Sequence, residues 1–74
     1  MAYRTIQIKP STNILGVSYD EETMDLRVQF LRDGRAYTYS GVDARTAEGF
    51  SRAESAGQYL NAFIKNQYPF VEGG

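Results

Sequence analysis

The sequence predicts an α+β domain with an antiparallel three- to four-stranded sheet, covered on one face by a C-terminal helical region. Apolar and polar residues alternate along most of residues 4–40, which is the period of half-buried strands. An Asp33-Gly34 pair within this stretch is typical of a tight hairpin turn. After Gly41 the apolar residues recur at helical spacing instead.

The first three strands follow from the alternation of apolar and polar residues. Residues 4–9 form a short strand that Pro10 ends, because proline cannot donate a ladder hydrogen bond. Residues 13–19 and 24–31 form the next two strands, and a four-residue polar turn joins them. The expected pairs are Tyr19 with Met24, Val17 with Leu26, and Leu15 with Val28. All six side chains would then share the apolar face.

A further strand covers residues 35–40 after a two-residue loop at Asp33-Gly34. The expected pairs are Phe30 with Tyr37 and Val28 with Tyr39. Both tyrosines would therefore lie on the apolar face of the sheet. The opposite face would be polar and would carry Ser18, Asp25, Arg27, Gln29, Thr38 and Ser40.

The helical region contains two N-cap signals. Asp43 can cap a helix that buries Ala47 and Phe50, although Gly49 weakens its middle. Ser55 is followed three residues later by Gln58, which is the spacing of a capping box. The apolar stripe expected after this cap consists of Tyr59, Leu60, Phe63 and Ile64.

The end of the chain is apolar enough to pack. Residues 68–71 contain two aromatic side chains, which we expect to close one edge of the core before residues 72–74 fray.

The composition favours a binding module over an enzyme. We expect one domain over residues 1–74, with its core over about residues 4–71, because 74 residues leave no room for a second core. The chain lacks histidine and cysteine, which removes the commonest general base, the strongest nucleophile and the thiolate ligands. The acidic turn at residues 20–25 lacks the glycine of a calcium loop. We therefore expect no catalytic residue, cofactor, metal or small-molecule substrate.

The expected cellular location and the net charge narrow the class of possible partners. No apolar run approaches the ~18 residues that cross a bilayer, so we expect a cytoplasmic protein without membrane contact. Eight basic and nine acidic residues give a net charge of −1, which argues against non-specific DNA binding. Six of the eight basic residues are arginine, the side chain best suited to phosphates and stacked rings.

Tyr37 and Tyr39 have two interpretations. Exposed beside Arg32 and Arg35, they would form a stacking platform for nucleic acid. Buried, they would be core residues whose hydroxyls reach the rim. The two-residue turn favours burial.

Several motifs together resemble the KTSC domain, a family named for the C-terminus of some lysyl-tRNA synthetases and also found as stand-alone bacterial and phage proteins. They are Ser11-Thr12-Asn13-Ile14, Val17-Ser18-Tyr19-Asp20, Tyr37-Thr38-Tyr39 and Ser55-Ala56-Gly57-Gln58-Tyr59-Leu60-Asn61 with Ile64. The resemblance spans residues 11–70, and RNA binding has been proposed for this family. In this motif we assign structural roles to Ser55, Gly57, Tyr59, Asn61 and Ile64.

Two functions remain open. The first is weak RNA binding by the polar sheet face and its turn, with Arg27, Arg32 and Arg35 contacting phosphates and the rims of Tyr37 and Tyr39 adding contacts. The second is a protein-binding regulator, for example a phage-encoded inhibitor of host transcription that binds an RNA polymerase subunit. A net charge of −1 suits a protein partner better than RNA.

Overall fold

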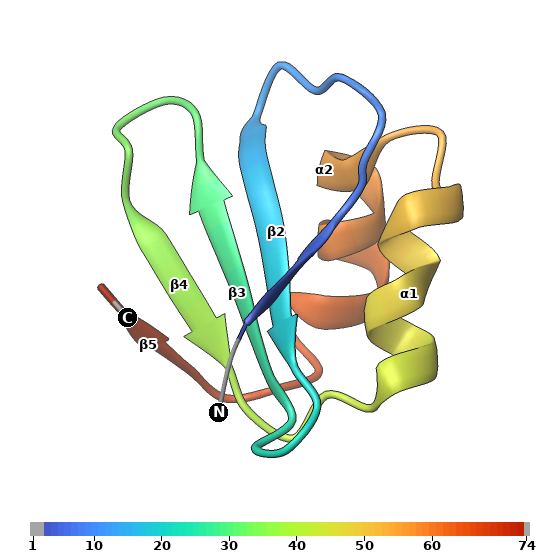
Figure 1. The fold of residues 1–74 in the computed structure, drawn as a ribbon. Helices are drawn as coiled ribbons and strands as arrows, with labels where there is room; N and C mark the ends of the chain where they lie inside the picture. Colours follow the sequence, from blue (N-terminus) through green and yellow to red (C-terminus); the bar gives the residue numbers. More distant parts are fainter. Residues whose placement is uncertain (1–2, 74) are drawn as a thin grey trace.

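In the computed structural model, which describes residues 3–73, a five-stranded antiparallel sheet packs one face against the helices (Figure 1). The elements are β1 (Arg4–Ile6), β2 (Ile14–Asp20), β3 (Asp25–Phe30), β4 (Ala36–Tyr39), α1 (Ala44–Arg52), α2 (Ala56–Tyr59), η1 (Leu60–Ile64) and β5 (Phe70–Glu72). Each strand pairs with the next in the order β1-β2-β3-β4-β5. The α+β class and the helix-covered face are confirmed, but the sheet has five strands and not three or four.

The additional strand is β5, which the chain adds after the helices. It pairs with the free edge of β4, where Phe70 lies opposite Tyr39. Two further backbone bonds extend the pairing, from Gly73 N to Ala36 O and from Ser40 N to Pro69 O. A three-residue strand is too short for its sequence to show the alternation of apolar and polar residues. It is recognised only by its pairing with β4. The apolar tail therefore closes the core edge as a strand.

The first hairpin has a different register from the predicted one. Asp20 pairs with Asp25, so the loop comprises residues 21–24 and the expected pairing of Met24 is wrong. The Asp20 side chain accepts a hydrogen bond from Glu22 N at 2.9 Å, and Met24 has a φ of 61°. Tyr19 now lies opposite Leu26. Because the shift is two residues, the four core side chains of this hairpin keep their predicted face; they are Val17, Tyr19, Leu26 and Val28.

The second hairpin is shifted in the same way. Asp33-Gly34 lies in the turn as predicted, but the loop spans residues 31–34, and Val28 pairs with Tyr37 and not with Tyr39. Gly34 has a φ of 72° and donates its N–H to Phe30 O, which closes the loop. The even shift again leaves both tyrosines on the apolar face.

Leu15 departs from its predicted face because of a bulge. The β2–β3 register shifts between Ile14 and Gly16, which gives β2 one extra residue. Ile14 is buried, whereas Leu15 is 55% exposed. The bulge therefore turns Ile14 toward the core and Leu15 toward solvent.

The core lies between the sheet and the helices. Its largest fully buried side chains are those of Tyr19, Phe50, Leu26, Ile64, Val17, Val28 and Val42. Asp43 and Ser55 cap their helices as predicted, by accepting from Thr46 N at 2.8 Å and from Gln58 N at 3.3 Å. No helix within residues 3–73 is long and apolar enough to cross a bilayer.

The segment after Ser55 is not a regular α-helix. The η1 segment is a π-helix, in which Lys65 N donates to Leu60 O five residues earlier. This wider turn keeps Ile64 in the core, but Phe63 faces outward and is 55% exposed. The prediction that Phe63 is a core residue is wrong, because it assumed an unbroken α-helical period.

Candidate ligand-binding groove

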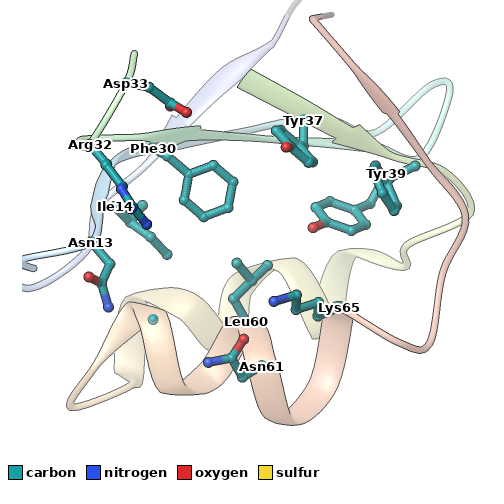
Figure 2. Close-up of a pocket in the computed structure, with 12 residues that line it drawn as sticks. Asn13, Ile14, Phe30, Arg32, Asp33, Tyr37, Tyr39, Leu60, Asn61 and Lys65 are labelled. Carbon is teal, nitrogen blue, oxygen red and sulfur yellow. The ribbon is translucent and has the colours of Figure 1, made fainter. Parts of the chain in front are cut away.

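A groove of about 390 Å³ lies between the β3–β4–β5 side of the sheet and the α2–η1 segment (Figure 2). Its lining residues are Asn13, Ile14, Phe30, Arg32, Asp33, Tyr37, Tyr39, Gly57, Leu60, Asn61, Lys65 and Phe70. They come from the β1–β2 loop, the β3–β4 hairpin, the helical segment and β5. Segments far apart in the sequence therefore build one site.

Four aromatic rings form the sheet side of the groove. Tyr37 meets Phe30 edge-on at a centroid distance of 5.3 Å and stacks on Phe70 at 5.2 Å. Phe70 also meets Tyr39 at 5.5 Å. The β4–β5 register causes this, because it places Phe70 directly opposite Tyr39. The resulting apolar wall suits a flat, unsaturated ligand.

Two tyrosine hydroxyls and two amides add hydrogen-bonding groups. Burial raises the pKa of Tyr39, and neighbouring Tyr37 adds to the shift, so the Tyr39 hydroxyl remains a donor at neutral pH. Figure 2 shows the amides of Asn13 and Asn61 on the helical side of the groove. Each amide offers both donors and an acceptor.

Cationic side chains lie toward both ends of the groove. Arg32 extends from the β3–β4 loop beside Phe30, and Lys65 follows η1 (Figure 2). Neither forms an ion pair with any residue of 3–73, whereas Arg4, Lys9 and Arg35 all do. Their charges are therefore available to an anionic ligand.

Gly57 permits the helix to approach the β1–β2 loop. A Cβ at this position would lie 3.1 Å from Asn13 Nδ2, which is tighter than ordinary contact. The loop is itself held in place, because Ser11 Oγ accepts from the backbone N–H groups of Asn13 and Ile14 at 3.1 Å. Gly57 and Ser11 thus position the Asn13 amide at the groove.

The structure divides the five residues predicted to bind RNA. Arg32, Tyr37 and Tyr39 line the groove. Arg27 lies on the opposite sheet face, because it alternates with buried residues of β3. Arg35 is held by Glu72 and Asp33. The five residues therefore do not share one surface.

The residues to which structural roles were assigned lie in different surroundings. Ser55 caps α2, Ile64 is fully buried, and Tyr59 Oη donates to Thr46 O at 2.7 Å. Asn61 is exposed and lines the groove, so it belongs to the site and not to the core.

Sequence reasoning missed three further members of the groove, Asn13, Lys65 and Phe70. Asn13 lay within a recognised motif, and Phe70 within an apolar tail. Lys65 had no signal beyond its charge. Within residues 3–73, no group of three metal-ligating side chains lies close enough to hold an ion.

The KTSC domain family model matches residues 10–68, which is most of the chain. The chain belongs to the KTSC domain family. The crystal structure of a KTSC domain protein from Yersinia pestis shares 32% sequence identity with it and has a TM-score of 0.87. This similarity covers 99% of the present chain and 100% of the other. No curated protein matches the sequence significantly.

Seven residues of the motifs that identified the KTSC domain line the groove. They are Asn13, Ile14, Tyr37, Tyr39, Gly57, Leu60 and Asn61. The motifs are separated in the sequence, and folding brings them to this one place. The groove is therefore our candidate functional site of this KTSC domain.

Proposed function

We propose that this KTSC domain is a non-catalytic module that binds single-stranded RNA, with an unstacked base in the groove. One observation carries the proposal: an aromatic wall, two amides and two unpaired cations line the same groove. Proteins that recognise single-stranded RNA combine stacking rings, base-edge hydrogen bonds and phosphate contacts in this way.

The aromatic wall supplies the stacking energy. A base that lies against Tyr37 and Phe70 replaces solvent on their rings, and such stacking contributes ~1–3 kcal/mol per base. Phe70 is half exposed before any ligand enters, so its ring is accessible. Stacking tolerates every base, so this contact alone favours RNA binding without strong sequence preference.

The amides can read the edge of the base. Asn13 and Asn61 lie across the groove from the rings, and each can donate and accept. The hydrogen-bonding edges of a base likewise contain donors and acceptors. We expect Asn61→Ala to weaken binding with little effect on stability, because Asn61 is exposed.

Arg32 and Lys65 would contact the phosphates on either side of the base. Two neutralised phosphates on a single strand give a slope of log affinity against log salt of about −1.4. The net charge of −1 adds no long-range attraction for RNA. Binding is therefore weak, on the order of micromolar or weaker at physiological salt.

A fluorescence-anisotropy titration of a labelled RNA of about 8 nucleotides, within the range of small single-strand sites, tests this function. Arg32→Gln combined with Lys65→Gln should lower affinity on the order of tenfold and flatten the salt slope. The matched control is Arg45→Gln with Arg52→Gln, which removes two arginines of α1 that form no ion pair among residues 3–73 and do not line the groove. Equal losses from both pairs, or no binding by the wild type at low salt, would contradict the proposal.

A protein-binding regulator is the second candidate, and β5 favours it. Within residues 3–73 this strand pairs on one side only, and Phe70 and Val71 are exposed there. An extended segment of a partner, for example a polymerase subunit, could add to such an edge. Capture of one defined protein from lysate after nuclease treatment, together with absent RNA binding, would favour this candidate.

A further inference from the structure

The sheet face away from the helices carries a straight row of side chains centred on Arg27. Direct cross-strand partners place Thr5 beside Ser18, Ser18 beside Arg27, and Arg27 beside Thr38. Partners in an antiparallel ladder project to the same face. Arg27 on the central strand therefore has a residue with a hydroxyl side chain as its direct neighbour on each side.

Arg27 has unused hydrogen-bonding capacity. Its Nε is buried and has no hydrogen-bond acceptor within the described part of the chain. A buried donor without a partner is costly, so such a group in a folded protein calls for an explanation. Asp25 lies two residues earlier on the same face of β3, yet it forms no ion pair with Arg27 among residues 3–73.

The β2 bulge hollows the surface next to this arginine. A depression of about 210 Å³ is bordered by Arg27, Ser18, Thr5 and Gln29 and by residues 15–17, which include the bulged Leu15. The bulge turns Leu15 outward at its margin. A small ligand could therefore sit in this shallow hollow beside Arg27, and Thr38 borders Arg27 on the side away from the hollow.

We propose that Arg27, Ser18 and Thr38 form a second site, which binds a phosphate-type oxyanion. Arginine presents its donors in a planar fork, which matches two oxygens of an anion. Hydroxyls on the two neighbouring strands add donors on both sides of Arg27. Donors in several directions suit a tetrahedral anion better than a flat carboxylate. The site lies on the opposite face of the sheet from the groove, so it is independent of the proposed RNA contact.

The Nε–Hε signals of the arginines, observed by ¹H–¹⁵N NMR, test the site directly. Inorganic phosphate is titrated into the protein at constant ionic strength, with chloride as the balancing ion. We expect a saturable shift of the Arg27 signal together with the backbone amides of Ser18 and Thr38. The Arg45 signal is the internal control and should not saturate, because this arginine lies on α1 and forms no ion pair among residues 3–73.

Two variants and two alternative anions complete the test. Arg27→Gln should abolish the saturable shifts, and Ser18→Ala with Thr38→Ala should weaken binding several-fold while keeping the arginine. Dimethyl phosphate, a model of the nucleic-acid backbone, should bind more weakly than the phosphate dianion, which would identify a terminal phosphate as the ligand group. Non-saturating shifts, equal binding of acetate, equal or tighter binding of dimethyl phosphate, or unchanged shifts at residues 18 and 38 in Arg27→Gln would overturn the proposal.

Discussion

Gly49 illustrates how one residue can reverse an expectation based on propensity. A glycine within a helix normally makes that helix less stable than an alanine would, by up to ~1 kcal/mol. In this protein, however, a Cβ at position 49 would overlap the Tyr59 hydroxyl and lie 2.6 Å from Tyr59 Cζ. The same ring meets Phe50 at 4.6 Å. Gly49 therefore leaves space for the Tyr59 ring, which packs from α2 against α1.

Gly49→Ala should consequently destabilise the domain, by ~1–3 kcal/mol, which is typical of overpacking. Urea unfolding measures the effect. In a Tyr59→Ala background the clash is absent, so the same change should become neutral or stabilising. A stabilising Gly49→Ala in the wild-type background would show that Tyr59 does not occupy this space.

The raised pKa of Tyr59 also leads us to expect a loss of stability at high pH. Burial is the main cause that raises its pKa above the ordinary value of 10.0. A raised pKa in the folded state stabilises the fold below the unfolded value, and this contribution disappears as pH rises through the folded value. Between about pH 9 and about pH 11, Tyr59→Phe should lose less stability than the wild type. Part of the alkaline loss should persist, since burial also raises the pKa of Tyr19 and Tyr39. Parallel pH profiles for the two proteins would contradict this explanation.

At the scale of elements, sequence patterns predicted strand faces well and pairing registers poorly. Both hairpins are shifted by two residues, the first because its four-residue loop begins one residue later than predicted and the second because its loop has four residues and not two. Alternation is unchanged by an even shift, so the faces were still correct. The bulge at Leu15 and the π-helix at residues 60–64 insert an extra residue into a regular period. The spacing of apolar residues in the sequence does not indicate where such insertions occur.

The π-helix makes a specific prediction about two neighbouring side chains. Ile64→Ala should cost ~2–5 kcal/mol, because Ile64 is fully buried. Phe63→Ala should cost ~1 kcal/mol or less, because Phe63 is 55% exposed and its ring meets Tyr59 at a tilted angle. Urea midpoints of the two variants compare them directly. Equal costs would indicate that residues 60–64 form a regular α-helix with Phe63 facing inward.

At the scale of the whole molecule, the helices cover one face of the sheet and leave the other face open. The groove lies on the covered side, between the sheet and the α2–η1 segment. The groove needs the β1–β2 loop, the β3–β4 hairpin, the helical segment and β5 together. Tyr37, Tyr39 and Arg32 were predicted as site residues from local sequence. Phe70 and Lys65 were not, because their positions depend on where β5 and η1 pack. Arg27 was assigned to the same site, although alternation along β3 places it on the other face.

The central claim is that the groove binds RNA, and a ¹H–¹⁵N NMR titration with a short single-stranded RNA tests it most directly. We expect the largest shifts at the side-chain amides of Asn13 and Asn61 and at the backbone amides of Tyr37, Gly57 and Phe70. Signals from α1, including Arg45, should remain nearly unchanged. Shifts confined to the open sheet face around Arg27, or no shifts at low salt, would contradict the claim.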